Sequence, residues 1–240
     1  MTGLYYDLHL HSCLSPCGDD DMTPANIAGM AAVKGLDVIA LTDHNSCLNC
    51  PAAMYHGEQY GVTVLPGMEL TTMEEVHVVC LFPNLASALS FDKYVYAHLM
   101  DIENKEEIFG KQQIMDETDT VTGNVKKLLI NATDISFDEA FPLVASYGGI
   151  AYPAHIDKTS TSLLSNLGFV PPDSTFSCAE IHDFKNLHQI QRQHPYFLNC
   201  HMISSSDAHY LEDIREPNYQ IFAKSREPEA ILAAIAGAKP

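Results

Sequence analysis

The sequence is poor in positive charge. It has 13 lysine and arginine residues against 31 aspartate and glutamate residues, which gives a formal net charge of −18 at pH 7. Such a surface repels the phosphate backbone of nucleic acids, so we expect no duplex nucleic acid as a partner. A small phosphorylated ligand that is drawn in by bound cations is compatible with this charge.

The sequence also lacks the long apolar runs of membrane proteins. No run approaches the ~18 residues that a membrane-spanning helix needs, and Met1 to Asp7 is not a signal peptide. We therefore expect a soluble, cytoplasmic protein with no membrane partner. The seven cysteines, an odd number, are then expected as thiols rather than disulfides.

The usual signatures of a side-chain nucleophile are absent as well. There is no serine elbow and no P-loop, and no cysteine has a base that the sequence makes evident. The chain does have 12 histidines, a high count for 240 residues. This combination directs attention to metal ions, because neutral imidazoles are common metal ligands.

The length and the hydrophobic fraction of 46% are typical of one globular domain over residues 1–240. Short apolar runs such as Asp37–Leu41 alternate with segments of helical spacing such as Ile27–Lys34. This alternation predicts an α/β fold with a largely parallel sheet and right-handed crossovers. About seven such units favour a closed or nearly closed barrel. Pro66 to Glu69 is expected to form a turn between two of the strands.

Residues 84–134 interrupt the alternation. We interpret them as an insertion between the fourth and fifth units, which could cover the mouth of the active site. Within it, only Phe91 to Ile102 is predicted as a helix.

The segment Tyr5–Ser12, YYDLHLHS, is predicted to be the first strand. His9 and His11 are two residues apart and would share one face of that strand. Two imidazoles at a strand end can hold one divalent metal. A bare HxH motif is equally typical of ordinary polar strand residues.

Several polar residues fall at or just beyond the ends of predicted strands. These residues are His9, His11, Asp43, His44, Glu69, His155, Asp207 and His209. Barrel enzymes build their active sites at the C-terminal ends of the strands. The pattern therefore predicts that these side chains meet at one rim of the barrel.

Six motifs, taken in order, resemble those of the polymerase and histidinol phosphatase (PHP) family, and most of all its stand-alone metal-dependent phosphoesterases. The motifs are HLHS from His9, TDH from Thr42, PGME from Pro66, the strand with His77, PAH from Pro153 and SDAH from Ser206. The resemblance extends from Tyr5 to about Arg215. It implies a distorted (β/α)7 TIM-like barrel that holds two to three divalent metal ions.

The resemblance also implies a set of ligands. The first metal would be surrounded by His9, His11, Glu69 and Asp207. Glu69 would bridge to a second metal, which His77 and His155 complete. His44, His209 and one ligand from the first loop would hold the third. Such mixed ligands suit manganese, iron or zinc alike.

The first loop departs from the family pattern, in which a short loop with a ligating aspartate follows HxH. Counting back from Thr23-Pro24 places Asp19 at that position, with Asp20 as the alternative. Counting forward from His11 places Pro16 there, which cannot bind a metal. Three solvated loop carboxylates are the other interpretation of this segment.

Three further residues are candidates for the chemistry. Asp43 is a candidate catalytic residue that would orient a ligand or carry a proton, although it could instead cap a turn. Lys158 and Arg215 are candidates for binding the phosphate of the substrate, and a solvated surface lysine is the alternative for Lys158. Glu180 and His182 share a strand face and could line the cavity or form a core pair.

The cysteines suggest a separate metal site. Cys13 and Cys17 lie in the first loop, and Cys47 and Cys50 follow His44 closely. Four thiolates at one rim could form a zinc or iron–sulfur site. Buried or merely adjacent thiols are the other interpretation.

These observations together predict a metal-dependent hydrolase that acts on phosphate ester bonds. A metal-activated hydroxide would attack a small phosphomonoester, such as a nucleotide or a histidinol-phosphate-like compound. A single-strand nuclease, an amide or lactone hydrolase and a non-catalytic metal or cluster sensor are the alternatives. The charge of −18 disfavours the nuclease, and the complete ligand set disfavours the sensor.

Overall fold

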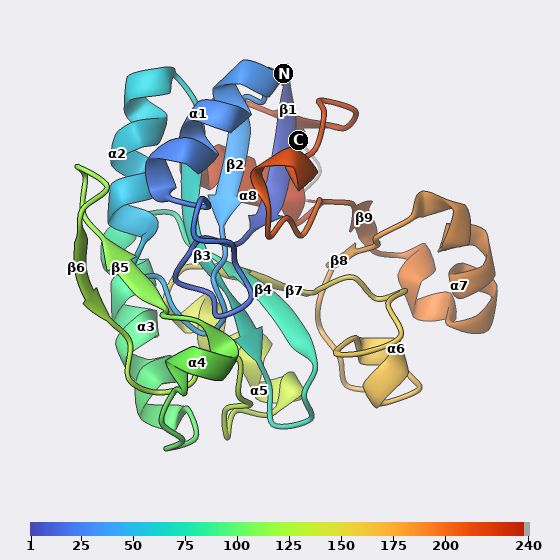
Figure 1. Ribbon diagram of the computed structural model, residues 1–240. Coiled ribbons are helices and arrows are strands. Elements are labelled where there is room, and N and C mark those ends of the chain that lie inside the picture. Colours follow the sequence, from blue (N-terminus) through green and yellow to red (C-terminus); the bar gives the residue numbers. More distant parts are fainter. Residues whose placement is uncertain (238–240) are drawn as a thin grey trace.

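The computed structural model describes residues 1–237 (Figure 1). Its centre is a curled six-stranded sheet with the spatial order β10-β1-β2-β3-β4-β7. The strands of this sheet are β1 (Thr2–Leu10), β2 (Val38–Leu41), β3 (Thr63–Thr71), β4 (His77–Leu81), β7 (Ile150–Pro153) and β10 (Gln220–Ala223). Two small sheets are formed by β5 (Gln113–Met115) with β6 (Val121–Asn124), and by β8 (Cys178–Glu180) with β9 (His201–Ile203).

Helices connect and cover these strands. The α-helices are α1 (Pro24–Lys34), α2 (Cys50–Tyr60), α3 (Leu85–His98), α4 (Glu106–Phe109), α5 (Phe137–Ser146), α6 (Leu163–Asn166), α7 (Leu187–Gln193) and α8 (Pro228–Ile235). Short 3-10 turns are η1 (Phe184–Asn186), η2 (Pro195–Leu198) and η3 (Leu211–Asp213). No helix among residues 1–237 is long and apolar enough to cross a membrane.

The sheet is mixed, whereas the alternation of the sequence predicted a largely parallel one. Strands β1, β2 and β3 are parallel, with α1 and α2 as their crossovers. Strand β4 is antiparallel to both β3 and β7. The cause is the short link of residues 72–76 between β3 and β4, because a parallel connection needs a dozen or more residues.

The turn that was predicted at Pro66–Glu69 is wrong, because β3 continues through it. Pro66 pairs with Leu41 of β2, while Gly67 already pairs with Leu81 of β4. A Cβ atom on Gly67 would lie 2.5 Å from the carbonyl oxygen of Cys80. Because Gly67 has no side chain, β3 can change its pairing partner from β2 to β4 at this residue. Glu69 therefore lies inside a strand and not in a turn.

Hydrogen bonds beyond the large sheet continue its curvature. The N–H of Ile156, just after β7, donates to the carbonyl of Glu180 in β8 at 2.9 Å. Just past β9, Ala208 forms a parallel bridge with Leu10, the last residue of β1. The β8–β9 pair is thus attached to the large sheet on both sides, and the strand ends face a common centre.

The segment 84–134 begins with a helix that starts earlier than predicted. Helix α3 starts at Leu85 because the side chain of Asn84 accepts a hydrogen bond from the N–H of Ser87 at 2.9 Å and caps the helix. It ends at His98, four residues before the predicted end. The β5–β6 hairpin that follows was not predicted.

This β5–β6 hairpin lies on the first loop. The N–H of Gln113 donates to the carbonyl of Cys13 at 3.0 Å, and its side-chain amide donates to Asp20 at 2.9 Å. The insertion segment therefore lies at the rim where the strand ends converge.

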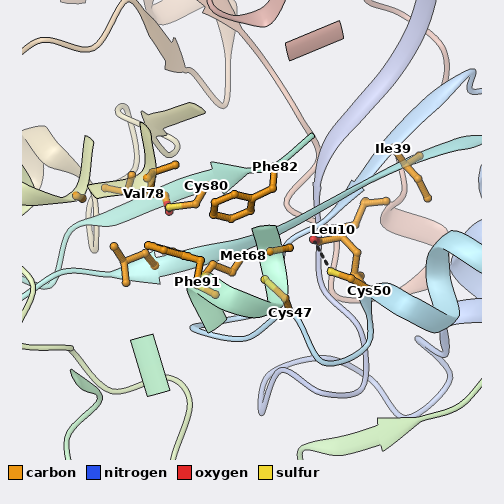
Figure 2. Packing of buried hydrophobic residues seen from close by; sticks show 14 of the residues in the cluster. Leu10, Ile39, Cys47, Cys50, Met68, Val78, Cys80, Phe82 and Phe91 are labelled. Atoms are coloured by element: carbon orange, nitrogen blue, oxygen red, sulfur yellow. Dashed lines mark hydrogen bonds between the residues drawn. The ribbon is translucent and has the colours of Figure 1, made fainter. Parts of the chain in front are cut away.

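The large sheet is buried on both faces. One hydrophobic cluster lies between the sheet and its helices and includes Leu10, Met68, Phe82 and Phe91 (Figure 2). The other contains Leu8, Tyr152 and further side chains from the opposite face. Each fully buried large apolar side chain contributes about 1.5–3 kcal/mol. This apolar frame fixes the positions of the polar side chains at the strand ends.

Candidate metal centre

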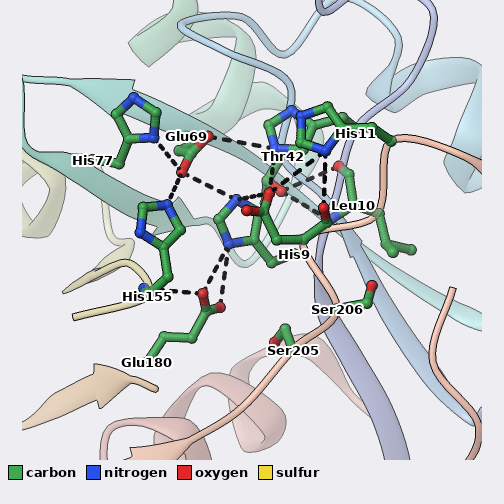
Figure 3. A network of polar contacts seen from close by, with 12 residues as sticks. His9, Leu10, His11, Thr42, Glu69, His77, His155, Glu180, Ser205 and Ser206 are labelled. Carbon is green, nitrogen blue, oxygen red and sulfur yellow. Dashed lines mark hydrogen bonds and ion pairs between the residues drawn. The ribbon is translucent and has the colours of Figure 1, made fainter. Parts of the chain in front are cut away.

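The carboxylate of Glu69 is the centre of the site, and only 1% of the residue is exposed. Its Oε1 atom lies 2.8 Å from Nδ1 of His77, 3.1 Å from Nε2 of His155 and 3.2 Å from Nε2 of His9 (Figure 3). We call these three histidines the Oε1 side. All three are buried, and they come from β1, from β4 and from the residue that follows Ala154 after β7.

The other carboxylate oxygen of Glu69 faces a second group. Its Oε2 atom lies 3.1 Å from Nδ1 of His44 and 3.4 Å from Nε2 of His11. The ring of His209 stacks on that of His11 with their centroids 4.3 Å apart. We call His11, His44 and His209 the Oε2 side. His209 is its most open member, with 25% of its side chain exposed.

Ligand atoms gather in three overlapping sets within residues 1–237. The atoms of each set lie within 4.8 Å of one another, as the donors of one metal ion would. The sets are His9, His11, Glu69 and Asp207; His44, Glu69 and His77; and His11, His44 and His209. His155 joins them through its contact with Glu69. Eight of the nine predicted ligands are therefore brought together.

His77 reaches the centre because of the antiparallel β4. It is the first residue of that strand, whereas His9 lies near the end of β1. An antiparallel strand places its N-terminal end at the edge where its parallel neighbours end. The rule that site residues follow strand C-termini therefore does not apply to His77.

Two of the predicted ligands have an unusual backbone. His155 has a φ angle of 29° and Asp207 one of 56°, both in the left-handed region that non-glycine residues avoid. Such a conformation costs about 1–3 kcal/mol per residue and persists where the surroundings impose it. Beside Asp207, the carboxylate of Asp7 accepts the N–H of Ser206 at 2.9 Å and holds the loop.

A second carboxylate orients His9. Nδ1 of His9 lies 3.1 Å from Oε1 of Glu180 and 3.2 Å from Oε2 (Figure 3). A carboxylate only accepts hydrogen bonds, so His9 donates from Nδ1 and its Nε2 lone pair faces Glu69. That Nε2 atom is buried without a hydrogen-bond partner.

The hydroxyl group of Ser15 orients His11 in a similar way. Ser15 donates its only hydroxyl proton to Oδ1 of Asp43 at 2.7 Å. The hydroxyl oxygen, 2.9 Å from Nδ1 of His11, is then an acceptor for the N–H of His11. In the neutral form of His11, this leaves Nε2 as the nitrogen without a proton, 3.4 Å from Oε2 of Glu69. Asp43, the predicted catalytic residue, thus acts on His11 through Ser15.

The pKa values reflect the crowding of charge in this space. Burial alone would raise the pKa of the Glu69 carboxyl, but His77, His9 and His44 hold it well below its usual range. Burial also lowers the pKa of His209, and the neighbouring His11 lowers it further, to about 3. Burial opposes protonation of His11, yet its hydrogen bonds to Asp207 and Glu69 raise its pKa to about 9.

The residues present fit a group of divalent cations. Nε2 of His9 and Nδ1 of His44 are buried, lack hydrogen-bond partners and point at the Glu69 carboxylate. Imidazole nitrogens and carboxylate oxygens together are the donors that zinc, iron and manganese accept. Cations would pair with these donors in place of protons, because metal binding releases the protons of its ligands.

Lys158 reaches this centre, and Arg215 does not contact it. The ammonium of Lys158 forms a short ion pair with Oδ2 of Asp207. The guanidinium of Arg215 donates to Oγ of Ser204 at 2.7 Å and to the carbonyl of Ser205 at 2.6 Å. These contacts attach Arg215 to the chain that follows β9.

Asp19 and Asp20 lie outside the three sets of ligand atoms. The carboxylate of Asp19 accepts the N–H of Asp21 at 2.9 Å and closes its own turn. Its N–H donates to the carbonyl of His209 at 3.0 Å, which keeps the loop close to the centre. Another member of this loop, the exposed Cys17, lies beside His44.

The four cysteines of the predicted thiolate site do not gather in one place. No group of potential ligands within residues 1–237 contains a cysteine. The thiol groups of Cys47 and Cys50 donate to the carbonyl of Gly67, at 3.2 and 3.5 Å. Both side chains lie in the hydrophobic core (Figure 2). Cys13 is buried beside Asn49, whereas Cys17 is exposed.

Two residues orient candidate ligands in ways that sequence reasoning did not foresee. It named Glu180 only as a cavity-lining or core residue, and it missed Ser15. Glu180 ends β8, so the strand-end rule that selected the other candidates could have selected it too. Its predicted partner His182 lies past the strand end and is exposed. Ser15 carried no signal, because nothing in the sequence shows that its hydroxyl reaches both His11 and Asp43.

The profile of the PHP domain family matches residues 7–159 of the chain. Among characterised proteins, a 5'-3' exoribonuclease of Haemophilus influenzae is 31% identical over 91 residues. This match covers 37% of the chain and 29% of the exoribonuclease. The chain thus aligns with less than a third of that relative's length.

Two solved structures have a similar fold. A lesion-specific endonuclease of Pyrococcus furiosus superposes with a TM-score of 0.69 at 19% identity, over 99% of the chain and 57% of the endonuclease. An amidohydrolase of Chromobacterium violaceum gives a TM-score of 0.56 at 20% identity, over 88% of the chain and 89% of the amidohydrolase. At these identities the similarity establishes the fold alone.

Proposed function

The chain belongs to the PHP domain family, and we propose that it is a metal-dependent phosphoesterase that hydrolyses small phosphomonoesters. The arrangement around Glu69 carries the proposal. One buried carboxylate faces three histidines with one oxygen and two with the other. A carboxylate in this position can keep two cations close together, as in two-metal hydrolases.

The proposed ligands are drawn from the three sets and from His155, and only the first group coincides with one set. His9, His11, Glu69 and Asp207 would hold the first cation, and Glu69, His77 and His155 the second. His44 and His209 would hold a third together with one donor of the first loop. Asp19 remains our proposed donor there, with Asp20 as the predicted alternative and the thiol of Cys17 beside His44 as a further one. When bound, the cations would supply an activated water and neutralise charge on the phosphate.

The chain's own residues would position the reactants. Lys158 lies next to Asp207 and would bind a phosphate oxygen. Asp43 would be a positioning residue that fixes His11 through Ser15. Arg215 stays a predicted phosphate ligand, and its contacts with Ser204 and Ser205 favour a role in holding the loop.

The surroundings of the site support two further parts of this proposal. We propose that β1, β2, β3, β4, β7, β8 and β9 form the distorted seven-stranded barrel, because hydrogen bonds connect each to the next around the centre. The segment 84–134 would limit access to the rim, since its hairpin rests on the first loop. One domain over residues 1–240 and a cytoplasmic location stay predictions.

The decisive experiment is a substrate comparison after removal and resupply of metal. The protein is stripped with a chelator and loaded separately with Mn²⁺, Fe²⁺ or Zn²⁺. We expect at least about tenfold higher kcat/KM for adenosine monophosphate than for a short single-stranded oligonucleotide at one salt concentration, a difference of ~1.4 kcal/mol. No hydrolysis of either substrate with any of the metals would refute a phosphoesterase that acts on nucleotides or nucleic acids.

A single-strand nuclease is the second candidate, and the similarity to a 5'-3' exoribonuclease favours it. Faster turnover of the oligonucleotide in the same comparison would establish it. The net charge of −18 works against it, because the surface repels a polyanion. A four-cysteine metal site stays a prediction that the separate positions of the thiols do not favour.

A further inference from the structure

A cavity adjoins the metal centre at Lys158. Its volume is about 590 Å³, and it lies between the loop after β7, helix α6 and the η1–α7 segment. In Figure 1, α6 and α7 lie together at one side of the molecule, beyond the ends of β7 and β8. Lys158 lines the cavity and also contacts Asp207, so its side chain joins the cavity to the centre.

The cavity combines apolar and amide side chains. Ile156, Leu164 and Ile190 supply the apolar part. Asn186, Gln189 and Gln193 supply carboxamides, each of which both donates and accepts hydrogen bonds. Within residues 1–237, the amides of Gln189 and Gln193 form no hydrogen bond, so both can pair with a ligand.

The single carboxylate of the lining is already satisfied. Asp157 accepts the N–H of His182 at 2.6 Å, the N–H of Asp183 at 3.0 Å and the amide of Asn186 at 2.9 Å. These bonds connect the loop after β7 to the η1 turn and build one wall of the cavity. A cationic ligand would find no unpaired acidic group there.

From this lining we infer that the cavity binds the nucleoside part of a nucleotide whose phosphate lies at the metal centre. Apolar side chains suit the faces of a base, and glutamine amides can pair in two-point fashion with the edge of adenine. The volume lies in the range of small-molecule sites. Histidinol phosphate is disfavoured, because its ammonium group would meet carboxamides rather than a carboxylate. This inference rests on the proposed phosphoesterase function.

The first test measures binding without catalysis. Adenosine, which carries no phosphate, is titrated into the wild-type protein and into the double variant Gln189→Ala/Gln193→Ala by calorimetry. We expect adenosine to bind the wild type and the double variant to bind it at least about tenfold more weakly. His188→Ala is the matched control, because His188 is an exposed residue of the same helix that does not line the cavity. Equal affinity in all three proteins, or no binding to the wild type, would overturn the inference.

The second test separates the cavity from the reaction. With metal supplied, we compare kcat/KM for adenosine monophosphate, ribose 5-phosphate and histidinol phosphate. The double variant should lose about tenfold with adenosine monophosphate and nothing with ribose 5-phosphate, whereas His188→Ala should lose nothing with either. Equal turnover of all three esters would refute the cavity's role and leave the phosphoesterase intact. No turnover of any ester would refute the phosphoesterase, while adenosine binding would still report on the cavity.

Discussion

The two sides of Glu69 are built in different ways. On the Oε1 side, His9 and His77 belong to β1 and β4, and His155 follows β7 directly. All three are at most 8% exposed. On the Oε2 side, only His11 directly follows a strand of the large sheet, whereas His44 and His209 lie in loops beside the first loop. His209 is the most open of the histidines around Glu69.

This difference shows what positions a ligand. Register within the sheet fixes the Oε1 side, because Glu69 pairs with Val79 in β4 and Val78 pairs with Pro153 in β7. On the Oε2 side, His44 forms an isolated bridge with Glu69, and the first loop holds His209 through the N–H of Asp19. We therefore expect metal binding to tolerate no substitution of the histidines on the Oε1 side. Substitution of the donors in the loops should weaken metal binding only in part.

The largest expected effect comes from the carboxylate that the two sides share. Glu69→Gln should lower kcat/KM at least about 1,000-fold, ~4 kcal/mol, because an amide cannot bridge two cations. Metal analysis should show a lower occupancy at both of the cation sites that Glu69 would bridge. Glu58→Gln, an exposed change on α2, is the control. Near wild-type turnover of Glu69→Gln would exclude the bridge.

The next effect tests the orientation of the Oε1 side. Glu180→Gln keeps the shape of the side chain but removes the charge that fixes the His9 ring. We expect about 10- to 100-fold lower metal affinity and activity. Equilibrium titration with Zn²⁺ measures the affinity, and the exposed Glu212→Gln is its control. An unchanged affinity for Zn²⁺ would mean that Glu180 is a buried core residue that does not orient His9 for metal binding.

A smaller effect is expected on the Oε2 side. His209→Ala should reduce metal content from three ions to two per chain, leave two tightly bound, and lower kcat/KM about tenfold, ~1.4 kcal/mol. Elemental analysis of the variant measures the content. Loss of all metal would mean that the two sides of Glu69 are not independent.

The first loop provides a finer test of the same side. We expect Asp19→Asn to weaken binding of the third cation, with the exposed Asp21→Asn as the neighbouring control. Asp20→Asn tests the alternative loop carboxylate. Cys17→Ser, measured in parallel, distinguishes the carboxylate from the thiol beside His44. If only Cys17→Ser changes the affinity, the loop ligand is the thiol.

The smallest effect on metal is expected for the core cysteines. Cys47→Ser and Cys50→Ser each place a hydroxyl among apolar side chains. We expect each to lower the free energy of unfolding by about 1–3 kcal/mol, with metal content and absorption spectrum unchanged. Denaturant unfolding measures the loss. Loss of one zinc equivalent or of a chromophore would instead support a thiolate site.

The sequence by itself determined most of the candidate ligands that the structure brings together. The HxH pair, His44, Glu69, His155, Asp207 and His209 are recognisable because ligands must be imidazoles or carboxylates and must stand near strand ends. His77 was identified from its family motif. The family, the α/β class and the first parallel units also followed from local pattern, since a strand or helix is encoded by neighbouring residues.

Only the tertiary structure decided where these candidate ligands lie relative to one another and which residues orient them. The antiparallel β4 brings the first residue of that strand to the rim, and Gly67 lets β3 change partners so that Glu69 lies inside the strand. Glu180 meets His9 across 171 positions of the chain, and Asp43 reaches His11 only through Ser15. Such contacts depend on packing between segments far apart in sequence, and therefore no local pattern records them.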